Sequence, residues 1–162
     1  MAVPAACLVT FAAIGLLFDR PLVEDRRGVD HRLTPEDEAR ALETVRLFNA
    51  VYQDFYASGG DPALIDEFPA SKMVRHYTFR DLGYLRESEL VQVYDLANLV
   101  VVETKSDGPG RAVVRTREDW NYVYQRSSDR SPASEMKGMT AEFRYRLEAR
   151  ENGWVIVAWD PE

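Results

Sequence analysis

Met139-Thr-Ala-Glu-Phe-Arg-Tyr-Arg-Leu-Glu-Ala-Arg150 has an apolar or aromatic side chain at every odd position and a polar one at every even position. A period of two over this length is typical of a β-strand with one face toward the core and one toward water. Glu151-Asn152-Gly153 then predicts a turn, because Asn and Gly tolerate positive φ. The apolar run over residues 154–159 predicts a return strand that is covered on both faces.

The stretch over residues 111–125 alternates in the same way and predicts another long strand. One of its faces is largely apolar and aromatic and should lie toward the core: Val114, Thr116, Glu118, Trp120, Tyr122 and Tyr124. Two further strands are predicted over residues 87–95 and 99–105, followed by a turn at Ser106-Asp-Gly-Pro-Gly110. These strands together predict one antiparallel sheet.

Helices are predicted in the half of the chain before this sheet. Thr34-Pro35-Glu36-Asp37 can open a helix, because threonine caps, proline tolerates the first position and acids favour the positive end of the helix dipole. Apolar residues follow at helical spacing until Gly59-Gly60, which predicts a long amphipathic helix. A short second helix is expected over residues 62–66, and a third over residues 70–82 that Gly83 ends. The fold class is therefore α+β.

Three segments carry a resemblance to a known family. They are Gly110-Arg-Ala-Val-Val-Arg-Thr-Arg-Glu-Asp-Trp-Asn-Tyr122, Phe143-Arg-Tyr-Arg-Leu-Glu-Ala149 and Asn152-Gly-Trp-Val-Ile156. The chain resembles the NTF2-like, or cystatin-like, superfamily, and within it the ARC6-like domains that occur beside membrane anchors. The resemblance spans roughly residues 34–160 and implies a cone of one long helix, two short helices and a bent antiparallel sheet. Its motifs are structural, and the superfamily holds enzymes, transport adaptors and assembly modules, so it implies no particular reaction.

Length and composition exclude several classes of function. The 162 residues suffice for one domain with a sizeable core and an appendage. A net charge of −7 argues against a general nucleic-acid binder. Cys7 is the only cysteine, which excludes an internal disulfide, and with His31 and His76 it has no metal-ligand spacing. Gly59-Gly60 and Gly108-Pro-Gly110 lack the Lys-Ser/Thr of a phosphate loop. We therefore expect no metal and no cofactor.

Residues 1–18 are apolar apart from Thr10, and Asp19-Arg20-Pro21 follows them. As a helix they would cover about 27 Å, just short of the roughly 30 Å hydrocarbon layer. We predict a single-pass membrane anchor over residues 1–18, a charged linker over 19–33 and the NTF2-like domain over 34–162. Because the arginines near the segment all follow it, the positive-inside rule places the main domain in the cytoplasm. An extracytoplasmic domain is the alternative.

Other interpretations of residues 1–18 have weaker support. A cleaved signal peptide would need basic residues before the apolar run and a small-x-small site after it. Cys7 follows Pro4-Ala5-Ala6 as in a lipoprotein box, but only six residues precede it. A helix buried in a soluble protein is the third alternative, because the run is short for a membrane span. If residues 1–18 are a membrane anchor, their alanines and Gly15 would allow close packing against the transmembrane helices of a larger complex.

Enzymes of the NTF2-like superfamily, such as those resembling ketosteroid isomerase, place acid, base and hydrogen-bond donors inside the cone. The candidates for such roles in this sequence are His76, Asp95, Glu118, Trp120, Tyr122 and Tyr124. Arg75-His76-Tyr77 on an amphipathic helix is more typical of a surface histidine. A carboxylate such as Glu118 on an apolar strand face usually pairs with a neighbouring arginine. We therefore assign no catalytic residue and expect a protein that is not an enzyme.

The polar faces of two predicted strands share one surface. It carries five arginines, together with Asp119, Glu142 and Glu148: Arg115, Arg117, Arg144, Arg146 and Arg150. One interpretation is a ladder of ion pairs across the strands, each contributing a few tenths of a kcal/mol. The other is a docking face for an acidic partner or for lipid headgroups.

These observations predict a non-catalytic, membrane-anchored accessory or assembly subunit of a larger membrane complex, such as an energy-transducing or transport assembly. The alternative is a small-molecule-binding protein or an enzyme that uses the cone. Homodimerisation through the open sheet face is compatible with either function.

Overall fold

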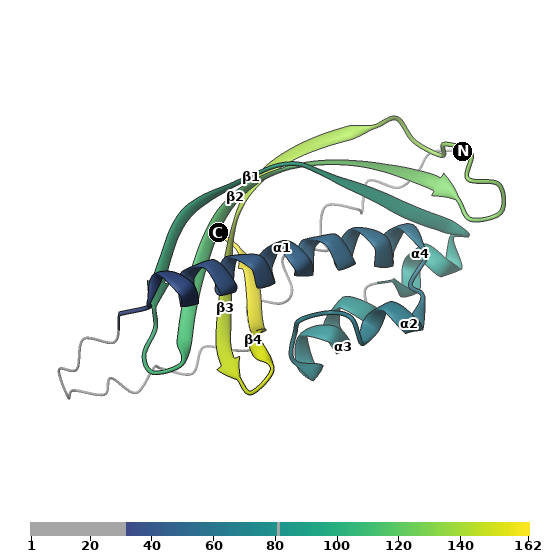
Figure 1. Ribbon diagram of the computed structural model, residues 1–162. Coiled ribbons are helices and arrows are strands. Elements are labelled where there is room, and N and C mark those ends of the chain that lie inside the picture. Colours follow the sequence, from purple (N-terminus) through teal and green to yellow (C-terminus); the bar gives the residue numbers. More distant parts are fainter. Residues whose placement is uncertain (1–31, 81) are drawn as a thin grey trace.

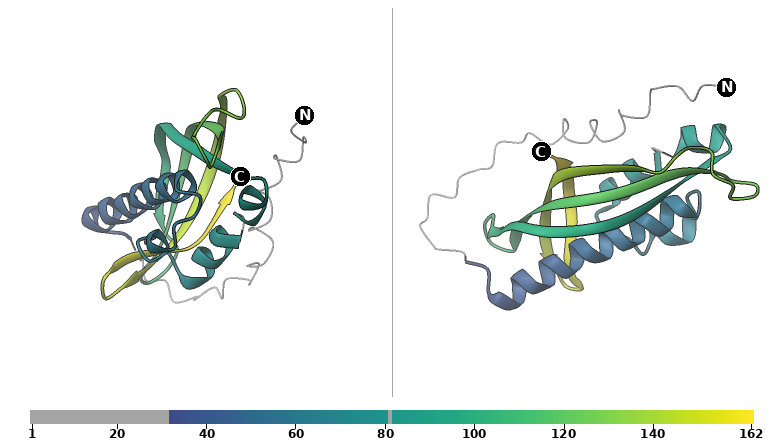
Figure 2. Two further views of the ribbon diagram at one scale, coloured as in Figure 1. Left: turned by 90° about the vertical axis from the view of Figure 1, so that its right-hand side faces the viewer. Right: turned by 90° about the horizontal axis from the view of Figure 1, so that it is seen from above.

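The computed structural model describes residues 32–80 and 82–162. Within them, helices precede one antiparallel sheet of order β1-β2-β3-β4. The helices are α1 (Pro35–Ala57), α2 (Pro62–Ile65), α3 (Lys72–Arg80) and α4 (Gly83–Glu87), and the strands are β1 (Leu90–Ser106), β2 (Arg111–Arg126), β3 (Lys137–Arg150) and β4 (Gly153–Pro161). The sheet bends over α1, and the short helices gather near the C-terminal half of α1 (Figure 1). Figure 2 shows the strands passing along α1 from above. The predicted α+β class is confirmed.

Helix α1 begins and ends where the sequence predicts. The Thr34 hydroxyl accepts a hydrogen bond from the Asp37 amide over 3.1 Å, and three acidic residues lie in the first turn. The buried side chains recur at helical spacing and face the sheet: Ala41, Val45, Phe48, Tyr52 and Phe55. Gly59 and Gly60 follow with φ of 76° and 85°, values that glycine adopts without a steric cost.

The segment between α2 and β1 differs from the prediction in two ways. The expected helix over residues 70–82 is shorter, and Gly83 begins α4 instead of ending a helix, so the two predicted short helices are three. Glycine lacks a Cβ and is tolerated at either helix end, which is why its position alone was misleading. The strands predicted over residues 87–95 and 99–105 are one continuous strand, β1. The register shift between Leu96 and Asn98 lets the strand pass through an irregularity without ending.

The register of β2 and β3 brings the two predicted inward faces together. Thr116 pairs with Phe143 and Val114 pairs with Tyr145, and all four side chains are buried. Glu118 pairs with Ala141, one step further along the same inner face. The alternation quoted for both strands is therefore confirmed as an inner and an outer sheet face.

The core inside the cone is largely aromatic. Phe48 of α1 contacts Trp159 of β4 with ring centroids 5.8 Å apart and Phe68 at 5.4 Å. Tyr52 lies 6.3 Å from Trp120 of β2. Edge-to-face pairs of this kind stabilise a core beyond the area that they bury. They hold α1 against β2 and β4, two strands from different parts of the chain.

The predicted membrane anchor, residues 1–18, and nearly all of the predicted linker lie outside the described residues. Cys7 and His31 lie outside them too. Among the helices that the structure describes, none combines the length and apolar character that a membrane crossing requires.

Candidate functional site

Glu118 is a carboxylate with no solvent exposure in the centre of the domain. Its Oε1 atom accepts hydrogen bonds from the Thr116 hydroxyl at 2.7 Å, the Tyr145 hydroxyl at 2.9 Å and the Asn49 side-chain amide at 3.1 Å. Its Oε2 atom accepts one from the Trp120 indole at 2.8 Å. We call these five residues the Glu118 cluster.

The backbone explains how the cluster forms. Thr116, Glu118 and Trp120 alternate along β2 and therefore share its inner face. Tyr145 reaches the carboxylate from β3, and Asn49 reaches it from the buried side of α1. Every partner donates, so four hydrogen bonds from neutral groups stabilise the carboxylate without a cation. The cluster thereby ties the helix to two strands through buried polar contacts.

The prediction that Glu118 pairs with a neighbouring arginine is wrong. None of the described arginines, lysines or histidines forms an ion pair with this carboxylate, whose partners are all neutral. Arg115, Arg117, Arg144, Arg146 and Arg150 occupy the opposite sheet face, since a one-residue step along a strand reverses the side. Asn49 was missed by the sequence analysis. Its signal was a single polar residue on the apolar face of α1.

A cavity of about 10 Å³ lies beside the Glu118 cluster. Aromatic residues and the cluster itself form its wall: Phe48, Asn49, Tyr52, Glu118, Trp120, Phe143, Tyr145 and Trp159. A space of this size holds roughly one water molecule, whereas small-molecule sites measure about 300–1,000 Å³. At this place the cone is filled by its own side chains.

The other predicted site residues do not join the cluster. His76 is exposed on α3 and lies against Tyr77, with ring centroids 5.8 Å apart. Asp95 is exposed on β1 and accepts a hydrogen bond from Asn121 at 3.5 Å. Tyr122 is half-buried. Of the predicted lining residues, the structure brings together Glu118 and Trp120, but neither the histidine nor the second carboxylate.

Burial determines the acid–base behaviour of the inner tyrosines. The pKa of Tyr145 is raised well above its usual value, first by burial and then by the negative charge of Glu118. Burial also raises the pKa of Tyr52 and of Tyr94, with smaller effects from neighbouring tyrosines. These phenols remain neutral in the folded protein across the physiological pH range. Tyr145 therefore acts as a hydrogen-bond donor.

Metal ligation finds no support in this part of the chain. Within residues 32–80 and 82–162, no three His, Cys, Asp or Glu side chains gather as a metal site would require.

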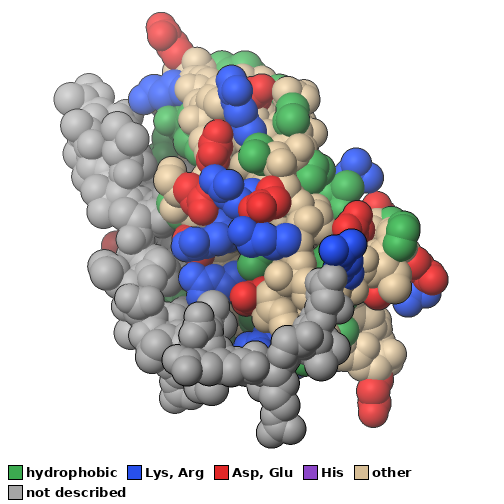
Figure 3. Space-filling model, turned by 90° about the vertical axis from the view of Figure 1, so that its left-hand side faces the viewer, with side chains coloured by type: hydrophobic (Ala, Val, Ile, Leu, Met, Phe, Trp, Pro, Cys, Tyr) green, Lys and Arg blue, Asp and Glu red, His purple; other side chains and the backbone are tan. Residues whose placement is uncertain are grey.

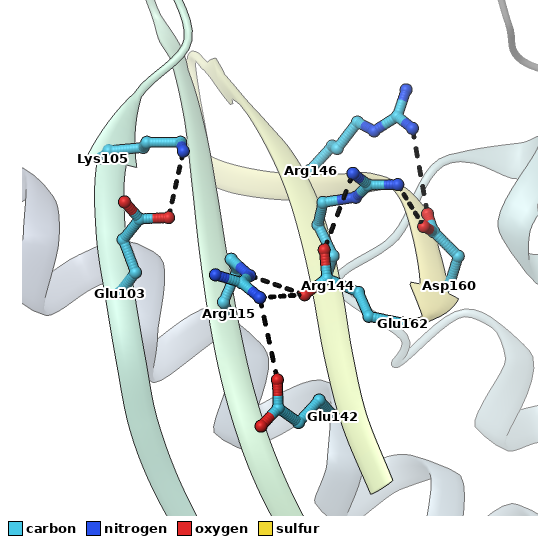
Figure 4. A network of polar contacts seen from close by, with 8 residues as sticks. All are labelled: Glu103, Lys105, Arg115, Glu142, Arg144, Arg146, Asp160 and Glu162. Atoms are coloured by element: carbon cyan, nitrogen blue, oxygen red, sulfur yellow. Dashed lines mark hydrogen bonds and ion pairs between the residues drawn. The ribbon is translucent and has the colours of Figure 1, made fainter.

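The outer sheet face carries the second candidate site. Basic and acidic side chains lie intermingled on this side of the molecule (Figure 3). Figure 4 shows that they come from neighbouring strands and point toward one another. We define the arginine network as three arginines and the three carboxylates that bind them: Arg115, Arg144, Arg146, Glu142, Asp160 and Glu162.

Glu162 lies at the centre of the arginine network. Its Oε2 atom accepts a hydrogen bond from Arg115 Nε at 2.6 Å, and its Oε1 atom lies 3.7 Å from Arg144 Nη1. Asp160 Oδ2 lies 2.7 Å from Arg144 Nη2. The hydrogen bond to Glu162 raises the pKa of the Arg115 guanidinium above its usual value. Asp160 lies in β4 and Glu162 follows its last residue. Both come after the apolar run that predicted a strand over residues 154–159.

Arg117 and Arg150 stand apart from the arginine network. Arg150 forms a separate ion pair with Glu148 at 3.4 Å. Asp119 accepts hydrogen bonds from Thr140 at 2.6 Å and Asn98 at 3.1 Å, and these bonds lower the pKa of its carboxyl. The surface of five arginines that the alternation predicts is therefore divided by the carboxylates between them.

Comparison by sequence found neither a matching family model nor a matching curated protein. Solved structures do match. The intermembrane-space region of the chloroplast protein ARC6 has a TM-score of 0.63 and 18% identity, covering 77% of this chain and 95% of that one. A proposed aromatic ring hydroxylase from Novosphingobium aromaticivorans has a TM-score of 0.51 and 12% identity, covering 80% and 90%.

An NTF2-like protein with a cystatin-like fold from Novosphingobium aromaticivorans also matches, with a TM-score of 0.46, 14% identity and coverage of 78% and 80%. Identities this low bear on the fold alone and not on the reaction or the partners. The helix, the bent sheet of order β1-β2-β3-β4 and the similarity to the ARC6 region agree with the fold predicted from the sequence. The described domain shares the fold of the intermembrane-space region of ARC6.

Proposed function

We propose that this chain is a non-catalytic accessory or assembly subunit of a larger membrane complex. Residues 1–18 would anchor it through partner transmembrane helices, and the NTF2-like domain would bind a partner protein at its outer sheet face. The domain is proposed to be cytoplasmic, on the charge bias of residues 19–33. An energy-transducing or transport assembly is the kind of complex we expect.

One observation carries the non-catalytic part of this proposal, namely the filled cone. The cavity beside Glu118 measures about 10 Å³, far below the volume of a substrate site. The donors around Glu118 already bind its carboxylate, so they are not available to a substrate. A cone that is filled at this place supports binding at the outer surface of the domain.

The experiment is affinity purification of the full chain from native membranes after solubilisation in a mild detergent. We expect a stoichiometric set of membrane proteins to accompany the chain. Deletion of residues 1–18 should remove them, while reversal of Arg115 and Arg144 to Glu should weaken the association. The matched control is reversal of Arg40 and Arg46, which are exposed on α1 and change the net charge equally. A chain that purifies alone would contradict the proposal.

The second candidate is a small-molecule-binding protein or an enzyme. The buried Glu118 carboxylate is the observation that favours it, because an inward carboxylate beside hydroxyl, amide and indole groups is a reactive combination in an open site. It requires the aromatic wall to move. Trp120→Ala would enlarge the cavity without removing Glu118. Native mass spectrometry of the wild-type chain should show a bound small molecule if this candidate is correct, and only the bare protein if the cone is filled.

A further inference from the structure

Arg115 on β2 and Arg144 on β3 are direct cross-strand partners on the outer sheet face. Two like charges at this position repel each other and destabilise the pair of strands. The Glu162 carboxylate lies between them, and Asp160 binds the other side of Arg144 (Figure 4). The sheet therefore holds an arrangement of cations that requires carboxylates between them.

We propose that the arginine network is a docking site for an extended acidic segment of a partner protein, and that Asp160 and Glu162 occupy it in the free chain. This inference rests on the proposed function, binding of a partner at the outer sheet face, and specifies the chemistry of that partner. The partner's carboxylates would replace those of Asp160 and Glu162 on Arg115, Arg144 and Arg146.

The geometry specifies the spacing of the carboxylates. Asp160 and Glu162 are two residues apart in an extended segment, so their side chains lie on the same face. A partner segment with Asp or Glu at positions i and i+2 would present the same pair. Arg115 binds Glu162 Oε2 through both Nε and Nη2. Guanidinium groups suit such multi-point contacts with carboxylates better than ammonium groups do.

The Glu162 side chain is the more readily displaced of the two without unfolding β4, because Asp160 is buried. The Arg115 and Arg144 side chains are 33% and 38% exposed, that of Glu162 is 24% exposed and that of Asp160 is 12% exposed. Ion pairs in contact with water contribute little to stability, so exchanging the Glu162 carboxylate for another costs little, whereas Arg144 must keep a carboxylate in the place of Asp160. The amide of Glu162 also donates to the Glu142 carbonyl at 2.9 Å, which holds the backbone while the side chain moves.

A protein segment fits this site better than a bilayer does. Three arginines and three carboxylates balance within the arginine network, and the whole chain carries a net charge of −7. An anionic membrane attracts a surface through its net positive charge, which is absent here. Individual guanidinium–carboxylate contacts do not need such a net charge.

The test measures binding of a fluorescein-labelled peptide of alternating Glu and Ser to the full chain in neutral detergent, by fluorescence anisotropy. Asp160→Asn with Glu162→Gln removes two of the three carboxylates of the arginine network and should tighten binding roughly fivefold at low salt. Adding Arg115→Gln to this variant should abolish the gain. The matched control is Glu103→Gln with Glu148→Gln, which also removes two carboxylates that form ion pairs on the sheet. It should leave the affinity close to that of the wild type.

A peptide of the same composition with adjacent glutamates, Glu-Glu-Ser-Ser, tests the i, i+2 spacing and should bind more weakly. Equal affinity of the wild type and the Asp160→Asn/Glu162→Gln variant would overturn the inference. So would arginine-dependent binding to phosphatidylglycerol vesicles without binding to the peptide. Because purified chain is used, the result is independent of co-purification from membranes. A chain that purifies alone but gains peptide affinity would refute the membrane-subunit proposal and leave the site intact.

Discussion

Tyr145 donates its hydroxyl hydrogen to the Glu118 carboxylate over 2.9 Å, and both side chains are excluded from water. The same hydroxyl lies 3.2 Å from Asn49 Oδ1 on α1. A buried charge or polar group that loses a partner regains no water in exchange. The stability of the domain should therefore depend on this polar contact as well as on the aromatic residues around it.

Replacing Tyr145 by Phe should lower the free energy of unfolding by about 1–3 kcal/mol, because Glu118 keeps its burial but loses a donor. Chemical denaturation followed by tryptophan fluorescence measures this change. Tyr122→Phe is the control, since Tyr122 is half-buried and its hydroxyl forms no hydrogen bond within the described residues. Equal destabilisation by the two variants would show that the contact to Glu118 contributes nothing specific.

The buried tyrosines make stability depend on alkaline pH. The pKa values of Tyr52, Tyr94 and Tyr145 are raised in the folded chain, so above pH ~10 the unfolded state loses protons that the folded state keeps. The free energy of unfolding is unaffected by these groups below that pH and falls as the pH rises above it. Tyrosinate absorbance should show these phenols titrating together with unfolding. Gradual titration of every tyrosine at its ordinary pKa, in a protein that stays folded, would contradict this prediction.

Gly60 follows α1 in a position that strongly disfavours any side chain. Its φ is +85°, and a Cβ there would lie 2.3 Å from Leu82 Cδ1, which is itself buried. Gly60→Ala therefore adds a clash to the backbone strain and should cost about 2–4 kcal/mol. Gly153→Ala is the matched control, because φ is +117° but a Cβ meets nothing within 4 Å. Thermal melts of the two variants should separate the clash from the strain, with Gly60→Ala melting lower.

Arg130 binds the C-terminal end of α1 from the loop between β2 and β3. Its Nη1 donates to the Ala57 carbonyl at 2.6 Å, and no basic residue lies in the last turn of the helix itself. Arg130→Ala should lower the free energy of unfolding by about 1 kcal/mol, since a cation is lost from the negative end of the helix dipole. Arg126→Ala is the control, because Arg126 bonds Ser131 within the same loop. An effect of equal size from both would indicate a general loss of loop order instead.

The outer sheet face shows how far the sequence could predict the candidate sites. Alternation along β2 and β3 places their arginines on one face correctly, because a strand reverses its side at every residue. The same alternation cannot show which carboxylates come between them. Asp160 and Glu162 do so through the register of β3 and β4, in which Arg144 is paired with Asp160.

The course of β1 shows a second limit of prediction from the sequence. Ala97 and Asn98 interrupt the apolar pattern and read as the end of one strand. The chain continues as β1 because β2 pairs with it and α1 contacts it. For example, the Leu96 amide donates a hydrogen bond to the Gln53 side chain of α1 at 3.0 Å. Such support comes from residues distant in sequence, so local patterns underestimate it.

The sequence by itself determined the long helix, the three strands from residue 111 onward and the face that each strand turns to the core, because periodicity and turn residues act over a few neighbouring positions. Tertiary structure alone decided that Asn49 and Tyr145 meet at Glu118, and that Glu162 separates Arg115 from Arg144. Both arrangements join residues from three or more elements. They depend on how the sheet bends over α1 and on the register of its strands, which no single segment of the chain encodes.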